Sequence, residues 1–454
     1  MARAKKGTAL TPEERLQAAL VPDWEWPYKL PENWCWVRLY SLAHIISKGT
    51  TPKGGKDAYV EKGIRFLRIE NINEDGSISH ENIKHITEEM HTGFLRRSIL
   101  CKDDILISIA GTLGKTGIVG EADLPLNTNQ AISFVRLIRG NLLPQYIKMS
   151  IDNPKTQDML ISQTKVTSIP NLTLEIIGNC AIPLAPLAEQ QRIVDRIESL
   201  FAKLDEAKEK AQAVVDSFET RKAAILHKAF TGELSAKWRE EHGVSIDNWK
   251  TTRFDSVAAI RSNLVDPAEY QSFPHIAPDN IEKKTGVLLE YHTIAEDGVT
   301  SGKHRFYSGQ ILYSKIRPYL SKAVVVDFDG LCSADMYPIE AYQNARCLWY
   351  YMLSDEFLLQ ASTAGSRSVL PKINQKELSA LTVHLPTNDR EQEEIARILD
   401  ELFDKEQQTK EAAEIVLDQI ELMKKSILAR AFRGELGTND PSEESAVELL
   451  KQII

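Results

Sequence analysis

Residues 189–234 read EQQRIVDRIESLFAKLDEAKEKAQAVVDSFETRKAAILHKAFTGEL, and residues 391–436 read EQEEIARILDELFDKEQQTKEAAEIVLDQIELMKKSILARAFRGEL. The two segments align without a gap at an offset of 202 residues (391 − 189), and 20 of their 46 positions are identical. Repetition at a fixed offset indicates that one structural unit is built more than once. We therefore expect a chain of two similar halves in tandem, which does one thing twice.

Apolar residues recur within each copy at steps that alternate between four and three, which is the heptad pattern of a coiled coil. They are Ile193, Ile197, Leu200, Leu204, Ala207, Ala211, Val214, Phe218 and Ile225 in the first copy, and Ile395, Leu399, Leu402, Ala413, Val416, Ile420, Met423 and Ile427 in the second. Each copy predicts a helix of about 40 residues, roughly 60 Å long. Two such helices from one chain can bury their apolar stripes against each other, whereas a single solvated helix is the alternative.

Short β-branched runs separated by turn residues precede each helical copy, as in residues 105–109 and 132–135. Such runs predict strands of a mixed or antiparallel sheet. Several residues of the first half recur in the second: Asn33 and Trp34 as Asn248 and Trp249, Asn71 and Ile72 as Asn280 and Ile281, and Ile105 and Leu106 as Ile311 and Leu312. The offset drifts from 215 (248 − 33) to 206 (311 − 105), so the two globular parts are expected to share a scaffold and to differ in their loops.

These patterns predict an α+β fold organised as a pseudo-two-fold tandem repeat. The expected segments are an N-terminal tail (residues 1–30), a first globular domain (31–183), a first helical repeat (184–236), a second globular domain (237–385), a second helical repeat (386–437) and a C-terminal tail with a short helix (438–454).

Composition limits the classes of function. The formal net charge is −9 at pH 7, so the chain lacks the basic balance of many nucleic-acid binders, and DNA contact would need cations gathered on one face. No run of 18 apolar residues predicts a membrane span. The five cysteines are scattered without a C-x-x-C pair, which predicts neither a disulfide frame nor a zinc site. We expect a cytoplasmic protein.

Motifs of catalytic sites are missing from the sequence. The loop 111–115 has two residues between its glycines, where a phosphate-binding loop has four. The N/D-P-P-Y/F tetrapeptide of adenine methyltransferases does not occur, and the ten histidines have no metal-ligand spacing. We therefore predict no catalytic residue and no metal site in this chain, with an enzyme that acts alone as a competing hypothesis.

A family signature accompanies the helical copies. A proline-rich strand end at residues 182–187 leads into Glu189-Gln190 and the long heptad, which ends in Ala-Phe-x-Gly-Glu-Leu at residues 229–234. The second copy repeats this order between residues 383 and 436. The signature resembles that of the DNA-specificity subunit of type I restriction-modification enzymes. The resemblance covers nearly the whole chain, as recognition domain, helix, recognition domain and helix.

The resemblance implies that each globular domain reads one half of a split, asymmetric site in double-stranded DNA. It also implies that the long helices pack as an antiparallel intramolecular coiled coil, which spaces the two domains and docks two methyltransferase subunits. Two restriction subunits can join such a complex. S-adenosylmethionine, ATP and Mg would then be bound by the partner subunits, and no cofactor by this chain. The alternative is a coiled-coil scaffold whose two domains bind ligands other than DNA.

Candidate contact residues follow from the chemistry of DNA. Arg and Lys suit guanine and phosphate, Asn and Gln suit adenine, and Ser and Thr suit phosphate. The loop residues that offer these groups are Lys48, Thr50, Thr51, Lys53, Arg68, Asn71, Asn73, Lys115, Asn129, Gln130, Lys165, Thr167, Arg261, Asn263, Asn280, Lys315, Arg317, Lys322, Arg367 and Ser368. For each cation, a solvated surface charge is the competing interpretation. The equivalent positions of Asn71 and Asn280 favour a role in turn structure.

A second set of residues is predicted to form the coiled coil and to dock the partner subunits. It comprises Ile193, Ile197, Leu200, Phe201, Leu204, Phe230, Ile395, Leu399, Leu402, Phe403, Ile427 and Phe432.

Overall fold

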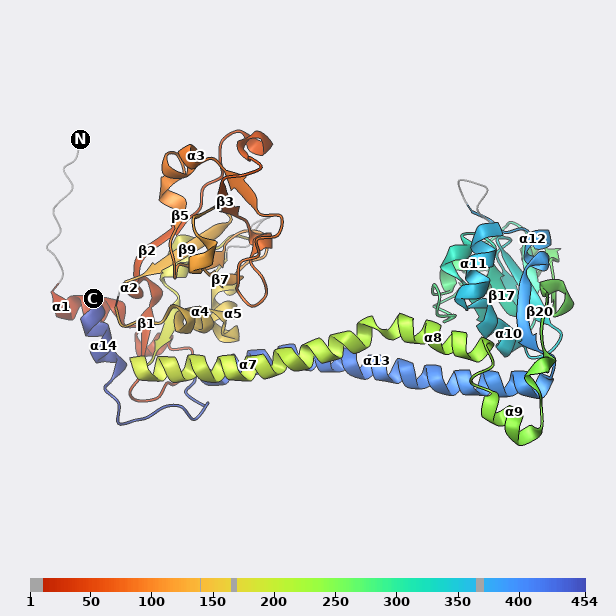
Figure 1. Ribbon diagram of the computed structural model, residues 1–454. Helices are drawn as coiled ribbons and strands as arrows, with labels where there is room; N and C mark the ends of the chain where they lie inside the picture. The colour runs from red at the N-terminus through yellow and green to blue at the C-terminus, as the bar shows by residue number, and fades with distance from the viewer. Residues whose placement is uncertain (1–10, 139, 165–169, 365–370) are drawn as a thin grey trace. The chain divides into compact units, whose positions relative to one another are not determined.

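The computed structural model describes residues 11–138, 140–164, 170–364 and 371–454. The chain forms two compact units: unit 1 lies within residues 1–209 and 416–454, and unit 2 within residues 210–415. Each unit contains one globular α+β domain and a part of both long helical repeats (Figure 1). Within the described part of the chain, no helix is both long and apolar enough to cross a membrane.

The helical repeats differ in continuity. The second repeat is one helix of 43 residues, α13 (Asp389–Ala431), as the heptad predicted. The first repeat is interrupted at Ser217 and forms α7 (Leu187–Asp216) and α8 (Phe218–Phe230). The Ser217 hydroxyl donates to the carbonyl of Ala213 at 2.6 Å, in competition with the backbone ladder. Back-bonding of this kind bends helices, which gives the interruption a local cause.

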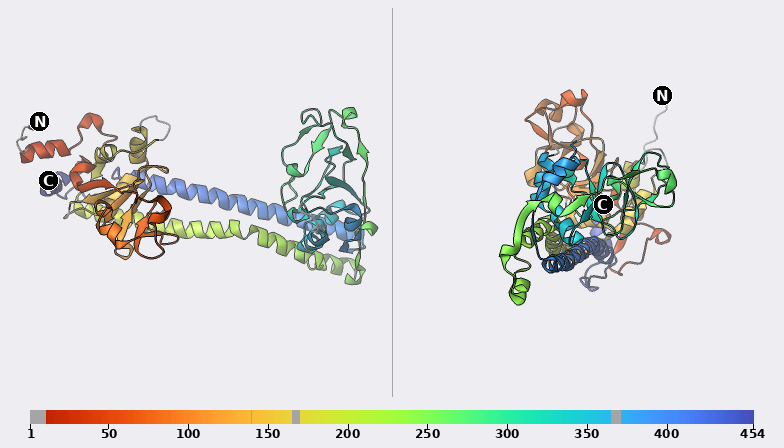
Figure 2. Two further views of the ribbon diagram at one scale, coloured as in Figure 1. Left: turned by 90° about the horizontal axis from the view of Figure 1, so that it is seen from above. Right: turned by 90° about the vertical axis from the view of Figure 1, so that its right-hand side faces the viewer.

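In unit 1, the first and second repeats run antiparallel. Asp205 pairs with Lys424 at 2.5 Å, and Lys208 pairs with Glu421 at 2.9 Å, so the partner's number falls as the residue number rises. Figure 2 shows α7 and α13 side by side in a further view.

Unit 2 contains the same antiparallel arrangement. Arg221 of α8 pairs with Glu406 of α13 at 2.7 Å, and the ammonium group of Lys410 lies 4.9 Å from the ring of Phe218. Glu406, a polar interruption of the predicted seam, is thus matched by a cation of the other helix. The predicted antiparallel pairing is therefore confirmed in each unit.

The inner face of α13 departs from the predicted heptad. Val416 and Met423 are 40% and 49% exposed, whereas their neighbours Leu417 and Lys424 are partly buried. A straight α-helix drifts about 20° per heptad relative to a strict seven-residue repeat. Positions counted in steps of seven from Ile395 therefore turn outward at Val416 and Met423, whereas Ile420 and Ile427 of the same predicted pattern stay buried or partly buried.

The unit 1 domain consists of three sheets, with strand orders β1-β10, β2-β9-β6-β7 and β4-β3-β8-β5. The strands are β1 (Cys35–Arg38), β2 (Ala43–Lys48), β3 (Ile64–Leu67), β4 (Lys84–Ile86), β5 (Ile99–Leu100), β6 (Ile105–Ser108), β7 (Thr116–Ile118), β8 (Leu126–Thr128), β9 (Ile132–Leu137) and β10 (Ala181–Leu184). The helices are α1 (Pro12–Ala19), α2 (Leu39–Leu42), α3 (Glu88–Thr92), α4 (Pro144–Asp152), α5 (Pro154–Ser162), α6 (Leu174–Gly178) and α14 (Ala446–Ile453).

The unit 2 domain also consists of three sheets, with strand orders β11-β21, β12-β20-β17-β18 and β13-β16-β19-β14-β15. The strands are β11 (Trp249–Arg253), β12 (Ala258–Ile260), β13 (Leu264–Val265), β14 (Pro274–Ile276), β15 (His292–Thr293), β16 (Lys303–Phe306), β17 (Ile311–Ser314), β18 (Ala323–Val325), β19 (Gly330–Cys332), β20 (Met336–Ala341) and β21 (Thr382–Pro386). The helices are α9 (Ala236–His242), α10 (Ala345–Met352), α11 (Asp355–Ala364) and α12 (Gln375–Ala380).

The two domains share one scaffold, to which unit 2 adds β13 at the edge of its five-stranded sheet. Ile105 of β6 lies opposite Val135 of β9, and Ile311 of β17 lies opposite Ile339 of β20, in sheets of corresponding strand order. A parallel pair joins otherwise antiparallel strands in each domain, β3 with β8 and β14 with β19. The predicted mixed sheet on a shared scaffold is thus confirmed.

A buried carboxylate lies at the start of each helical repeat, Glu189 in unit 1 and Glu391 in unit 2. Glu391 accepts hydrogen bonds from Arg239 (2.8 Å), Ser235 (2.8 Å), Asn248 (2.9 Å) and the indole of Trp249 (2.9 Å). Burial tends to raise the pKa of Glu391, but these four hydrogen bonds outweigh it, and the pKa is lowered.

Glu189 has the same position in unit 1, with fewer partners. It accepts from Thr438 at 2.6 Å and from Arg192 at 3.1 Å. Burial dominates here and raises the pKa of Glu189 against these hydrogen bonds. Gln190 and Gln392, the next residues, each donate to a backbone carbonyl at 2.8 Å. The repeated Glu-Gln pair thus has a structural role.

The described part of the predicted N-terminal tail, residues 11–30, contains α1 and contributes to the core of unit 1. Thr11 and Glu14 form a capping box at the start of α1, and Ala19 and Val21 belong to the core of unit 1. α1 also packs against α14, so the first and last helices of the chain meet in this unit.

Candidate nucleic-acid interface

Loops next to the β2-β9-β6-β7 sheet of unit 1 are held together by backbone hydrogen bonds. Gly49 donates to the carbonyl of Ile132 at 3.0 Å, Ile109 to that of Ala131 at 2.8 Å, and Leu172 to that of Ile109 at 3.1 Å. A Cβ atom at Gly49 would lie 2.0 Å from the Asn129 carbonyl oxygen, so only glycine permits this approach.

These loops enclose a pocket of about 490 Å³, whose polar lining residues are Lys48, Gln130, Asn171 and Thr173. A cation and two amides at the mouth can donate to phosphate and to base edges.

Unit 2 gathers the corresponding loops in the same way. Lys315 donates to the carbonyl of Asp335 at 3.0 Å, and Ile373 donates to that of Lys315 at 2.9 Å. Arg317 donates its backbone N–H to Pro371 at 2.8 Å. Its own φ of 48° lies in the left-handed region, which few residues other than glycine adopt readily.

One pair of predicted cations occupies equivalent positions in the two domains. Ser108 donates its backbone N–H to Lys115 at 2.8 Å, and Ser314 donates to Lys322 at 2.9 Å. The hairpin before the lysine is one residue longer in unit 2, so the offset rises there from 206 (314 − 108) to 207 (322 − 115).

Family models recognise both halves of the chain. Residues 31–215 and residues 246–416 each match the model described as "Type I restriction modification DNA specificity domain". The chain belongs to this type I restriction-modification specificity family.

Known members of the family are similar along much of the chain. The EcoDI specificity subunit of Escherichia coli is 38% identical over 316 residues, covering 63% of this chain and 71% of that protein. The EcoKI specificity subunit of Escherichia coli K12 is 22% identical, covering 94% and 96%. The crystal structure of the HsdS subunit from Thermoanaerobacter tengcongensis has the same fold, with a TM-score of 0.59 at 19% identity, covering 91% of this chain and all of that one.

The residues predicted to contact DNA differ in solvent exposure and in their bonds to the rest of the domain. In unit 1, Lys48, Thr51, Lys53, Asn73 and Gln130 are exposed. The partly buried candidates are Thr50, Arg68, Lys115 and Asn129. The guanidinium of Arg68 pairs with Glu70 at 2.8 Å, which reduces its availability to DNA.

In unit 2, Asn263 and Arg317 are exposed, and so is Arg261, which pairs with Glu340 at 2.8 Å. The ammonium groups of Lys315 and Lys322 donate to the carbonyls of Ala334 at 2.5 Å and Pro278 at 2.7 Å. These two lysines therefore stabilise loops of their own domain.

Asn71 and Asn280 have the turn role that their equivalence favoured. The Asn71 side chain is buried, accepts from the Arg68 N–H at 3.2 Å and donates to Glu81 at 3.3 Å. Asn280 accepts from Ala277 at 2.8 Å and donates to Glu290 at 2.7 Å. Their placement as DNA contacts is therefore not supported. The candidates Lys165, Thr167, Arg367 and Ser368 lie outside the described residues.

The structure adds three polar residues that the sequence reasoning missed. Asn171 and Thr173 line the unit 1 pocket, and Lys372 lies 3.2 Å from Asp335 in unit 2. Asn171 directly precedes Leu172, which donates to the residue after β6. Lys372 directly precedes Ile373, which donates to the residue after β17. The sequence holds no local signal for them, because residues 171–174 and 372–375, which are 201 positions apart (372 − 171), share no identical residue. Among the described residues, no cluster of His, Cys, Asp and Glu could hold a metal ion.

The residues predicted for the coiled coil and for docking are largely used inside the chain. Ile193, Ile197, Ile395 and Leu399 are buried at the starts of the helices, and Leu200, Phe201, Leu204, Leu402, Phe403 and Ile427 are partly buried. Phe230 contacts Tyr351 with ring centroids 5.0 Å apart, and Phe432 contacts Tyr146 at 5.3 Å. A partner subunit would therefore have to contact other residues of the helices.

Proposed function

We propose that this chain selects the DNA sequence for a type I restriction-modification complex, by reading an asymmetric, bipartite site with its two domains. The observation that carries the proposal is that one scaffold, built twice, presents different side chains at equivalent loop ends. Lys48 and Asn171 of unit 1 correspond to Ser262 and Lys372 of unit 2. Two domains with the same backbone scaffold but different hydrogen-bond donors on their loops are suited to two half-sites of different sequence.

Catalysis would belong to partner subunits. Two adenine methyltransferase subunits would bind S-adenosylmethionine, and two restriction subunits that use ATP and Mg could join them. The chain itself would act without a cofactor, in the cytoplasm. Its acidic balance fits a subunit whose partners supply much of the contact with phosphate.

A docking surface for the methyltransferase is available on α13 in unit 1. Val416, Leu422 and Met423 are 40%, 65% and 49% exposed, and two of them are seven residues apart, on one helical face. An exposed apolar row of this kind is typical of a surface that meets another protein.

Co-expression with the methyltransferase subunit of the same restriction-modification system tests the proposal. Methylated adenines mapped across a genome should fall in two short words separated by a spacer of fixed length. A single continuous word, or no methylation, would contradict the reading by two domains. The coiled-coil scaffold without DNA specificity predicts no salt-dependent DNA binding by the complex, whereas phosphate contacts make affinity fall steeply with salt.

A further inference from the structure

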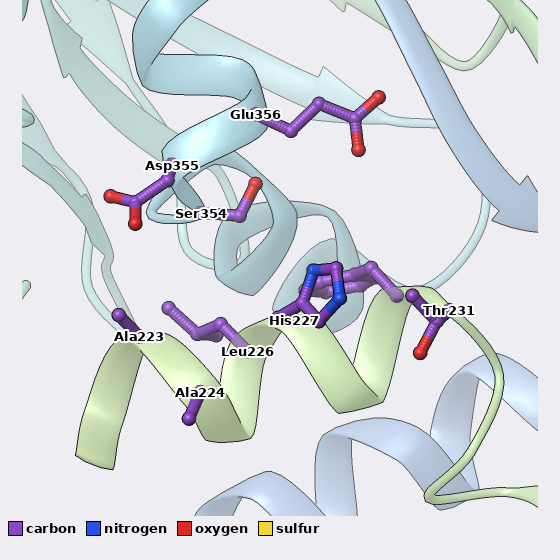
Figure 3. Close-up of a pocket in the computed structure, with 9 residues that line it drawn as sticks. Ala223, Ala224, Leu226, His227, Thr231, Ser354, Asp355 and Glu356 are labelled. Carbon is purple, nitrogen blue, oxygen red and sulfur yellow. The ribbon is translucent and has the colours of Figure 1, made fainter. Parts of the chain in front are cut away.

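A pocket of about 340 Å³ opens between α8 and the start of α11 in unit 2 (Figure 3). Leu226, His227 and Phe230 of α8 form one wall. Ser354, Asp355 and Glu356 lie across from them, where α10 ends and α11 begins. Leu226 and Phe230 are buried, so the floor is apolar, whereas both carboxylates of the rim are exposed.

The corresponding place in unit 1 is occupied by the chain itself. Asn153, the residue before α5, corresponds to Ser354 before α11. Its side-chain amide donates to the hydroxyl of Tyr28 at 3.2 Å, and the Tyr28 ring contacts Trp36 at 5.0 Å. Burial raises the pKa of Tyr28 to about 12, as for a phenol enclosed by protein.

The segment that carries Tyr28 also covers the end of the second helical repeat. A Cβ atom at Gly434 would lie 2.4 Å from Cγ of Pro31, so Pro31 packs directly on this glycine. In unit 2 the equivalent Gly232 is covered by Ile246, since a Cβ atom there would lie 2.7 Å from Cδ1 of Ile246. Pro31 and Ile246 are related by the offset of 215 (246 − 31) that also relates Asn33 to Asn248.

The same offset places Gly243 where unit 1 has Tyr28 (243 − 28 = 215). A Cβ atom at Gly243 would meet no atom within 4 Å. Unit 2 therefore has the wall and floor that hold a tyrosine in unit 1, but among its described residues no side chain takes the place of Tyr28.

The charge of the rim defines what could enter. Asp355 and Glu356 of unit 2 stand where unit 1 has Pro154 and Lys155. Thr231 replaces Arg433 at the end of the helical repeat, so a basic rim in unit 1 becomes an acidic rim in unit 2. Two exposed carboxylates repel DNA phosphate and attract a Lys or Arg side chain.

We infer that this pocket receives an aromatic side chain, flanked by a Lys or Arg, from the methyltransferase subunit that docks on unit 2. The inference rests on the proposed function, because the wall of the pocket is α8, the end of the first helical repeat. Unit 1 fills its own site with Tyr28, so the two docking sites for the methyltransferase differ at this position.

The test uses the full chain co-purified with the methyltransferase subunit of the same system, and native mass spectrometry to count subunits. Glu356→Lys reverses the rim charge, and Ala224→Trp adds bulk at an exposed lining position of α8. Each variant should weaken binding of one methyltransferase subunit about thirtyfold, as expected for a central contact, and retain the other. Glu269→Lys, an equal charge change at another exposed position of unit 2, should retain both subunits.

Each outcome decides between two ideas. Failure of the unaltered chain to bind any methyltransferase would contradict the proposed function itself. Two subunits bound equally by the unaltered chain, by Glu356→Lys and by Ala224→Trp would overturn the pocket inference alone. An equal loss in Glu269→Lys would overturn it too, as would a dimer of this chain that disappears in Ala224→Trp, because the occupant would then be a second copy. Glu356 is exposed and its replacement adds no bulk to the core, so the test stands even if Ala224→Trp misfolds.

Discussion

The ammonium group of Lys424 lies 5.2 Å from the centre of the Phe201 ring, across the pair of helices in unit 1. Unit 2 repeats this contact, with Lys222 at 5.4 Å from Phe403. Each lysine and each phenylalanine is related to its counterpart by the offset of 202 (424 − 222, 403 − 201). Both parts of the helix pair are thus held by the same cation–π contact, which explains why these positions stayed identical while the domains diverged.

Double-mutant cycles should detect this contact. Phe201→Leu and Lys424→Met, alone and together, should show a coupling of about 1 kcal/mol in the free energy of unfolding, the range for a partly exposed cation–π pair. Phe403 with Lys222 should give a similar value in its own cycle. The crossed cycle of Phe201 with Lys222 should show no coupling, because these residues lie in different contacts. Coupling in the crossed cycle alone would contradict the assignment.

The two buried glutamates should respond to pH with opposite signs. The pKa of Glu391 is lowered, so its carboxylate stabilises unit 2 above the unfolded-state pKa of about 4.5, and this contribution disappears as the pH falls through the lowered folded pKa. Glu391→Gln should therefore cost about 2 kcal/mol in the free energy of unfolding at pH 7 and progressively less in acid.

Glu189 provides the matched control for this experiment. Its pKa is raised by burial, so its protonated form is favoured in the folded state, and its contribution grows as the pH falls. Glu189→Gln should cost less than Glu391→Gln at pH 7, and the cost should increase on acidification. Chemical denaturation at several pH values measures both slopes, and parallel slopes would contradict the difference between the two sites.

Arg239 should be essential to unit 2 for the same reason. Its guanidinium is one of four groups that bond the Glu391 carboxylate, at 2.8 Å, and both side chains are largely buried. Arg239→Ala would leave a buried charge with one partner fewer, which typically costs about 3 kcal/mol or more. Arg239→Ala combined with Glu391→Gln should recover part of that loss in denaturation experiments. An additive double variant would show that the two residues do not act as a pair.

The architecture could be predicted from sequence because it depends on repetition. Two copies of one segment at a fixed offset predict two similar halves, whatever the path of the chain between them. The antiparallel pairing of the helices was predicted from the family resemblance. The interruption at Ser217 could not be predicted, because serine is tolerated in many helices and only its bond to Ala213 shows the break. The exposure of Val416 and Met423 could not be read from the heptad pattern. The rotation of the helix face relative to a seven-residue repeat is small at each turn and becomes large only over several turns.

The interface was harder to predict, because residue type indicates chemistry but not orientation. Lys315 and Lys322 are cations in loops, as predicted, yet their ammonium groups bind carbonyls of their own domain. Asn171 and Lys48 line the same pocket, although 123 residues (171 − 48) separate them in the chain. Tertiary contacts of this range leave no signal in the local sequence.

Lys48 and Arg317 give the sharpest test of two independent readers. Both are exposed in loops of their own domain, Lys48 at the end of β2 in unit 1 and Arg317 after β17 in unit 2. In the assembled methyltransferase, Lys48→Ala should reduce the slope of log affinity against log salt by about 1 if it contacts a phosphate, and by much less if it contacts a base. A base contact should instead cost about 1–3 kcal/mol and relax specificity at one position. Methylation of DNA altered in single half-sites should show that Lys48→Ala changes only one half and Arg317→Ala only the other. Equal effects of either variant on both halves would exclude a division of the site between the two domains.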